Sequence, residues 1–420
     1  MSDRIYKAYQ YAKERYAELG VDVDKAIERF NTIPISINAW ELDDLKGFMN
    51  LDKIGSDGGC IATGEYPGTA TTFEQLTQDL DMILANLPGK KKVSCTAKAV
   101  CYTEPGLDLN TIEPKHFQGY VDWAKTRNVG LDFGGGAFGH PMIKNNFTLS
   151  SPDPEVRDFW IESFVRCAKI GEHMGKELNQ KCITNIWIPD GYKDYPADQY
   201  SPRVRLVEAL DTIYERLGEQ KHNLCSLEGK VFGIGLEAYT VGSHDFYLAY
   251  AMNRKKCVTV DSGHYNPLED VATKLSALML FMDDIFMHVT RAMRWDSDHV
   301  VVMDDMTQAI TNEIIRNNWE KRIHLCTDFF DASINRIAAS VIGVRSLQKC
   351  ILRSILENTE ELRKAEREEN YGRRLALMEE YKTMPFNAVY DYICESAGVP
   401  VGHRWLDEVD RYEKDVLSRR

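Results

Sequence analysis

Acidic and imidazole side chains recur at the ends of apolar, β-rich segments in the second half of the chain. Glu228 ends "NLCSLE", Asp261 ends "CVTVD", His288 ends "IFMH" and Asp328 ends "IHLCTD", while His264 follows Asp261 by three residues. Each residue alone has a purely structural interpretation, as a helix cap, a turn residue or a hydrogen-bonded core histidine. Four such residues at successive segment ends favour instead one shared site that holds a cation.

The segment "RWDSDHVVVMDDM" (294–306) surrounds three valines with four aspartates. Carboxylates beside an apolar run are costly to bury unless a cation lies among them. Asp296 and Asp298 are two positions apart and point the same way if the segment is extended. Asp304 and Asp305 lie beyond the valines and are interpreted as the start of a helix.

The ligand types indicate which cation is expected. Oxygen ligands with some imidazole nitrogen and no thiolate favour a hard divalent ion, Mn²⁺ or Mg²⁺, with Co²⁺ and Zn²⁺ as alternatives. A single ion would leave substantial uncompensated charge, so the carboxylates predict two divalent ions per subunit. The five carboxylates counted here are Glu228, Asp261, Asp296, Asp298 and Asp328.

The elements that must position these residues alternate between short β-rich runs and helix-length spacers. This alternation predicts an α/β fold, a (β/α)₈ TIM barrel with an N-terminal helix over residues 1–345, in which the C-terminal strand ends converge on one face. A doubly wound sheet remains the alternative. The candidate strands are 32–38, 92–100, 129–133, 183–188, 223–228, 257–262, 285–289 and 323–329.

The remainder, residues 346–420, is charged and helical in period. Its heptads are not sustained, so a solvated helical face is favoured over a coiled coil. We expect an α-helical extension involved in packing or oligomerisation.

The run "GGGAFG" (134–139) matches G-x-G-x-x-G after a candidate strand. The following "HPMIKNNFTLSSPD" does not open a helix, so no helix N-terminus is available to bind a pyrophosphate. The run is interpreted as a flexible loop.

Composition limits the class of protein. A formal net charge of -13 argues against nucleic acid as a partner, and the ten scattered cysteines are typical of free thiols in a cytosolic protein. Because no signal peptide or membrane-spanning run is evident, a soluble cytoplasmic protein that does not bind a membrane is expected.

Several long segments occur in a specific order and spacing along the chain. They include "LEGKV", with Glu228 and Lys230, and also "VRLVEAL", "VFGIG", "VGSHDFYLAYA", "RWDSDHVVVMDD", "DFFDASINRIAASVIG", "TNIWIPDG" and "YEKDVLSRR". Together these segments resemble the L-rhamnose isomerase family, within the wider group of xylose-isomerase-like barrels in which a Glu-x-Lys at the fifth strand is a signature. The resemblance covers nearly the whole chain.

The resemblance implies two metal positions. A structural ion would be held by Glu228, Asp261, His288 and Asp328, and a catalytic ion by His264, Asp296 and Asp298.

It also implies the sugar pocket. Trp40 and Trp187 match aromatic residues that line it, and Asp190 and Lys193 follow at its mouth. Tyr66 matches an aromatic residue that family members lend to a neighbouring active site, which implies a homotetramer.

Three segments depart from the family pattern: "AKAVCY" places Lys98 where relatives have a pocket histidine, "FGGG" (133–136) replaces an "FNP" loop, and "SINAWE" replaces a "SMHCWQ"-like stretch.

The implied activity is the interconversion of an aldose and a ketose, L-rhamnose and L-rhamnulose, in rhamnose metabolism. Lys230 would donate a hydrogen bond to the developing oxyanion, and Asp328 or a water beside it would relay a proton between the oxygens. His264 would take part in catalysis as a ligand of the catalytic ion. A 1,2-hydride shift is favoured over an ene-diol path, because every candidate carboxylate is already a candidate metal ligand and therefore a weak base.

Three alternatives are a family member with another free sugar, a metal-dependent phosphodiesterase on a similar barrel, and a sugar-binding protein without catalysis. The acidic charge counts against the phosphodiesterase. The complete set of candidate ligands counts against loss of catalysis.

Overall fold

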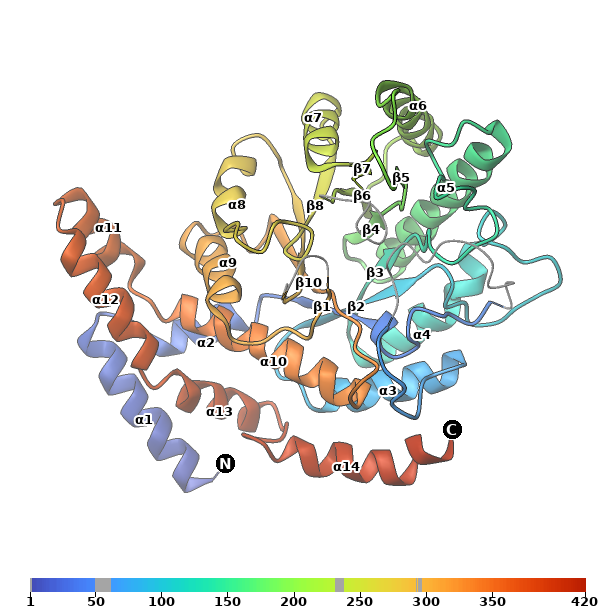
Figure 1. Cartoon of the computed structure of the whole chain (residues 1–420). Coiled ribbons are helices and arrows are strands. Elements are labelled where there is room, and N and C mark those ends of the chain that lie inside the picture. Colours follow the sequence, from blue (N-terminus) through green and yellow to red (C-terminus); the bar gives the residue numbers. More distant parts are fainter. Residues whose placement is uncertain (1, 50–61, 231–237, 292, 294–296) are drawn as a thin grey trace.

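A computed structural model describes residues 2–49, 62–230, 238–291, 293 and 297–420. Within these ranges, eight parallel strands form a closed barrel in the order β1-β10-β9-β8-β6-β4-β3-β2 (Figure 1). The predicted (β/α)₈ barrel is therefore confirmed, and the doubly wound sheet is excluded. The strands are β1 (Ile35–Asn38), β2 (Lys91–Thr96), β3 (Gly130–Gly134), β4 (Cys182–Ile186), β6 (Asn223–Glu228), β8 (Cys257–Asp261), β9 (Ile285–Val289) and β10 (Ile323–Thr327).

Each barrel strand is a short, largely apolar run that is covered on its outer side by a helix. The strands are buried because a parallel sheet closed into a barrel packs side chains on both faces. The helices that follow the eight strands are α3 (Phe73–Ala85), α4 (Gln118–Arg127), α5 (Pro154–Glu177), α6 (Tyr200–Leu217), α7 (His244–Arg254), α8 (Ala272–Leu278), α9 (Asp305–Arg316) and α10 (Arg336–Ile355).

The strand register brings the predicted ligands together. Asp261 on β8 pairs with His288 on β9, and Glu228 on β6 pairs with Thr259 on β8. Asp328 follows the last residue of β10, so all four residues lie at the C-terminal end of the barrel. This is the end at which barrel enzymes carry their active sites.

The N-terminal and C-terminal helices lie outside the ring of barrel helices. In Figure 1, α1 (Asp3–Glu18) lies beside α13, and α14 runs below α10 and α3. The predicted boundary after residue 345 falls inside α10, so the division at that residue stays a prediction. The other outer elements are α2 (Val23–Phe30), α11 (Thr359–Arg367), α12 (Tyr371–Thr383), α13 (Phe386–Ser396), α14 (Trp405–Asp415) and the short helix η3 (Leu417–Arg419).

The predicted helix start at Asp304 is confirmed. Asp304 is the N-cap of α9 and accepts a hydrogen bond from the Thr307 amide at 2.8 Å. The nine described cysteines are free thiols. No helix among the described residues has the length and apolar character needed to cross a membrane.

Candidate metal centre and sugar pocket

Four predicted ligands converge at the C-terminal mouth of the barrel. Glu228, Asp261, His288 and Asp328 each offer one ligand atom, and these atoms lie within 4.8 Å of one another. His288 Nδ1 lies 3.5 Å from Glu228 Oε1, 3.6 Å from Asp261 Oδ2 and 2.8 Å from Asp328 Oδ2. Oxygens about 2.1 Å from a divalent ion lie roughly 3 to 4.2 Å apart, so this spacing fits one ion.

A second oxygen of each carboxylate is held by a hydrogen-bond donor outside the cluster. Asn185 Nδ2 donates to Glu228 Oε2, and the Gly263 amide donates to Asp261 Oδ1 at 2.6 Å. Trp40 Nε1, on the short helix η1 (Ala39–Glu41), donates to Asp328 Oδ1 at 3.1 Å. These donors leave Glu228 Oε1 and Asp261 Oδ2 buried without a well-formed hydrogen bond from any described residue. Such inward, under-satisfied oxygens fit a cation site.

The electrostatics of the cluster favour a positive charge at its centre. Burial raises the pKa of Asp261 to about 7. Burial also acts on Glu228, but the imidazoles of His288 and His264 outweigh it and lower the pKa of Glu228 to about 2. Burial opposes a charge on His288, yet the carboxylates of Glu228 and Asp328 raise the pKa of His288 well above its usual range. The imidazoles thus compensate the charge of Glu228 but not that of Asp261, so the cluster can accommodate further positive charge.

The residues proposed for the second ion are only partly described. His264 lies beside the first cluster, with Nδ1 3.3 Å from Glu228 Oε1. Asp298 lies close to Gly263, the residue before His264. A Cβ atom added to Gly263 would stand 3.5 Å from Asp298 Oδ1. Both side chains line the pocket. Asp296 lies outside the described residues, so its role stays a prediction.

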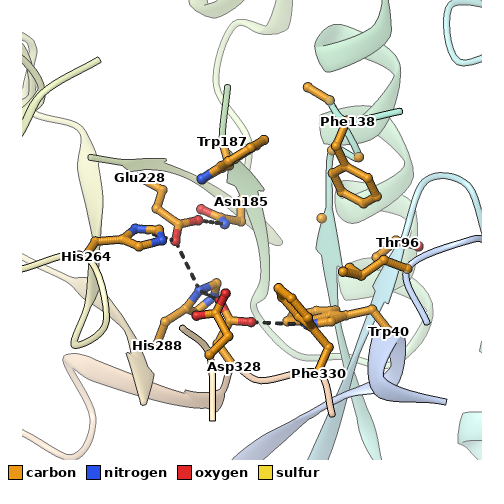
Figure 2. A pocket seen from close by; sticks show the side chains of 16 residues that line it. Trp40, Thr96, Phe138, Asn185, Trp187, Glu228, His264, His288, Asp328 and Phe330 are labelled. Atoms are coloured by element: carbon orange, nitrogen blue, oxygen red, sulfur yellow. Dashed lines mark hydrogen bonds and ion pairs between the residues drawn. The ribbon is translucent and has the colours of Figure 1, made fainter. Parts of the chain in front are cut away.

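The cluster forms one side of a pocket, and aromatic rings form the other. Figure 2 shows Glu228, His264 and His288 facing Phe138 across the pocket, with Trp40 and Phe330 below the ring of Phe138. Trp40 and Trp187, both predicted, line this pocket. The lining also includes residues that the sequence analysis did not single out, namely Leu45, Thr96, Phe138, Asn185 and Phe330.

Lys230 is not among the described lining residues of the pocket. It is 3% exposed, and its Nζ lies 4.2 Å from the centre of the Trp187 ring. It is therefore close to a pocket residue, and its predicted hydrogen bond to an oxyanion stays a prediction.

Asp190 is not among the described lining residues of the pocket, so its predicted place at the pocket mouth stays a prediction. Its carboxylate is fully buried and accepts four hydrogen bonds, from the amides and hydroxyls of Thr148 and Ser150. Burial raises the pKa of Asp190, while these donors oppose that rise. Asp190 anchors the loop between β3 and α5.

Three other predicted pocket residues lie outside the described lining of the pocket. Lys98 is 6% exposed, and its Nζ donates to the carbonyl of Phe138. Lys193 has an exposed side chain. Tyr66 donates its hydroxyl to Glu413 Oε2 at 2.8 Å in the same chain, so its predicted contribution to a neighbouring site stays a prediction.

Comparisons with known proteins agree on one family. A model of the family "L-rhamnose isomerase (RhaA)" matches residues 3–420. An L-rhamnose isomerase of Listeria innocua is 50% identical over 99% of both chains. One of Lactiplantibacillus plantarum is 46% identical over 100% of this chain and 98% of its own. The solved structure of an L-ribulose 3-epimerase covers 76% of this chain and 95% of its own, with a TM-score of 0.49 and 12% identity.

Proposed function

The chain belongs to the L-rhamnose isomerase family, whose activity is that of an aldose–ketose isomerase, and we propose that it interconverts L-rhamnose and L-rhamnulose. The observation that carries this proposal is the convergence of three carboxylates and one imidazole within 4.8 Å beside an aromatic pocket wall. The phosphodiesterase alternative is not favoured, because the family match covers almost the whole chain.

The proposed cofactor is Mn²⁺, two ions per subunit, with Co²⁺, Zn²⁺ or Mg²⁺ as alternatives. Glu228, Asp261, His288 and Asp328 would hold one ion, and His264, Asp296 and Asp298 the other. When bound, such ions polarise a sugar carbonyl and acidify the neighbouring hydroxyl.

The residues of this chain would bind and orient the sugar. Trp40 and Trp187 supply apolar faces for its ring carbons. Lys230, held against Trp187, would donate a hydrogen bond to the oxygen on which negative charge develops. Asp328, or a water beside it, would pass the proton between the two sugar oxygens.

Metal removal tests this proposal. Exhaustive chelation is expected to abolish isomerisation of L-rhamnose, and Mn²⁺ is expected to restore it, because three carboxylates share one small volume. The measurement is ketose formation by the chelated and reloaded protein, across a panel of free aldoses and ketoses. Full activity of protein shown to be metal-free by elemental analysis would contradict the proposed metal dependence. A faster reaction with another sugar would reassign only the substrate.

We propose a direct hydride shift between C1 and C2. The carboxylates that line the described pocket, those of Glu228, Asp298 and Asp328, are all candidate metal ligands, which makes them weak bases toward carbon. A single turnover in heavy water is therefore expected to leave little deuterium on carbon, as measured by mass spectrometry of the product. Substantial deuterium at C1 or C2 would show a general base and an ene-diol path.

The proposed assembly is a cytoplasmic homotetramer with Tyr66 at a neighbouring active site. This proposal is supported by the family resemblance and by the position of Tyr66 outside the pocket lining of its own chain. Light scattering measures the oligomeric state directly, and a fully active monomer would rule out the shared active site.

A further inference from the structure

Lys98 is a buried lysine whose ammonium group contacts both the backbone and the ring of Phe138. Its Nζ donates to the carbonyl oxygen of Phe138 and lies 4.2 Å from the centre of the Phe138 ring. A second, longer contact reaches the carbonyl oxygen of Gly139 at 3.4 Å. One cation thus contacts both the backbone and the ring face of Phe138, and a cation–π contact of a desolvated lysine stabilises such an arrangement.

The segment that carries Phe138 has little regular structure of its own. It follows β3, where Gly136 adopts a positive φ of +68° and its carbonyl accepts a hydrogen bond from the Phe138 amide at 2.8 Å. The carbonyls of Phe138 and Gly139 face Lys98 and receive hydrogen bonds from it. Both carbonyls belong to half-buried residues and lose this donor when the ammonium group is removed, which favours a different loop conformation.

The backbone of Lys98 is itself fixed. Its carbonyl accepts hydrogen bonds from the amides of Phe48 at 2.9 Å and Met49 at 3.3 Å. Gly47, with a φ of +65°, packs so closely that a Cβ there would stand 2.4 Å from the Cβ of Lys98. The backbone of Lys98 is therefore fixed, and its side chain can restrain the Phe138 segment.

Phe138 belongs to the pocket wall. Its ring lies 6.4 Å from that of Trp187 at 71°, and it lines the pocket opposite the carboxylate cluster (Figure 2). We propose that Lys98 is a positioning residue, which fixes the ring of Phe138 and thereby the width of the sugar pocket. This inference rests on the proposed function, and it differs from direct contact between Lys98 and the sugar.

The test compares Lys98→Met, which keeps the aliphatic stem and removes the ammonium group, with Lys98→Arg, which keeps a cationic donor. With L-rhamnose, Lys98→Met is expected to raise KM about tenfold and to change kcat less than about twofold, because binding geometry changes and the chemistry does not. Lys98→Arg is expected to have a KM close to that of the wild type. Lys91→Met is the matched control, because Lys91 lies at the other end of β2 and donates to the Leu87 carbonyl at 2.8 Å.

Hydrogen–deuterium exchange of the peptide 135–147 gives a readout that needs no sugar. Lys98→Met is expected to accelerate its exchange, and Lys91→Met is not. Lys98→Gln, which keeps one donor, is expected to give intermediate exchange and serves if the Met variant does not fold. If the wild-type protein does not isomerise L-rhamnose, the proposed function fails, and the exchange data still decide whether Lys98 holds the segment.

A double substitution separates positioning from contact. If Lys98 acts through Phe138, Lys98→Met added to Phe138→Leu raises KM little further. Additive effects of the two substitutions, a fall in kcat at unchanged KM, or exchange equal to that of the wild type would each overturn the inference.

Discussion

At the scale of single residues, the metal cluster is defined as much by its outer donors as by its ligands. The Glu228 carboxylate is oriented by Asn185, whose Oδ1 accepts a hydrogen bond from Thr259 Oγ1 at 2.7 Å. Thr259 Oγ1 is in turn 2.7 Å from Ser226 Oγ. This buried chain fixes which oxygen of Glu228 turns inward.

Asn185→Ala is therefore expected to weaken metal binding about 10- to 100-fold, because an outer hydrogen-bond partner orients its ligand. Calorimetric titration of the chelated protein with Mn²⁺ measures this. Asn223→Ala is the matched control, because Asn223 is also buried and accepts a hydrogen bond from Thr184 Oγ1 at 2.9 Å, but begins β6, whereas Glu228 ends it. Equal Mn²⁺ affinity in both variants and the wild type would contradict the orienting role of Asn185.

The sequence predicted the four clustered ligands because each directly follows or ends a recognisable strand. It did not single out Asn185, although a polar residue inside the apolar run "ITNIWI" was an available signal. It did not reveal the donors to the Asp190 carboxylate, because Thr148 and Ser150 belong to a loop some 40 residues away in sequence. Side-chain direction in such loops depends on tertiary contacts that have no local pattern.

At the scale of elements, all eight barrel strands were predicted, since each combines apolar β-forming residues with a helix-length spacer. The two-stranded sheet of β5 (Gly191–Tyr192) and β7 (Tyr239–Thr240) was not, because two residues carry no hydrophobic period. The start of α10 depends on a contact that sequence spacing does not reveal. Its first residue, Arg336, forms a bidentate ion pair with Asp44 at 2.6 and 3.0 Å.

Asp44→Asn is expected to lower the free energy of unfolding by about 2–4 kcal/mol at pH 7, because it leaves the buried Arg336 without its anionic partner. Burial opposes ionisation of Asp44, but Arg336 and Lys46 outweigh it and lower its pKa below the usual range. A lowered pKa contributes stability above the unfolded-state value, near 3.9, and that stability disappears as the pH falls through the folded-state value. The deficit of the variant should thus shrink below about pH 4.

Urea unfolding at pH 7, 5 and 3.5 measures this deficit. Asp3→Asn is the control, because Asp3 and Lys7 form an exposed pair whose loss should cost less than about 1 kcal/mol. A deficit for Asp44→Asn that is the same at every pH would contradict the assigned linkage.

At the scale of the whole molecule, the C-terminal helices are tied to the barrel by buried charge. Arg420 donates to Asp79 on α3 at 2.6 and 2.8 Å, and the Tyr412 hydroxyl donates to the same carboxylate at 2.7 Å. The side chains of Arg420 and Asp79 are 8% and 3% exposed. The segment after α14 is therefore held against the outer ring of barrel helices.

Arg420→Met is expected to lower the free energy of unfolding by about 3–5 kcal/mol, because it leaves the buried Asp79 carboxylate without its cationic partner. Chemical denaturation measures the loss. Arg367→Met, which breaks the exposed pair with Glu360, is the control and should cost less than about 1 kcal/mol. Equal small losses in both variants would show that the Asp79 contact does not hold the C-terminal segment.

The closure of the barrel through β1 and β10 has a consequence for biosynthesis. Ile35 pairs with Leu325, so β1 lacks its second neighbour until about three quarters of the 420-residue chain has been synthesised. At roughly 5–20 residues per second, translation separates the two strands by about 15 to 60 s. During that interval an unpaired β1 edge is open to aggregation. Asp328 directly follows β10, so the four proposed metal ligands can come together only after β10 has been synthesised. Any stabilisation of the barrel by a metal at this cluster therefore follows the pairing of β10.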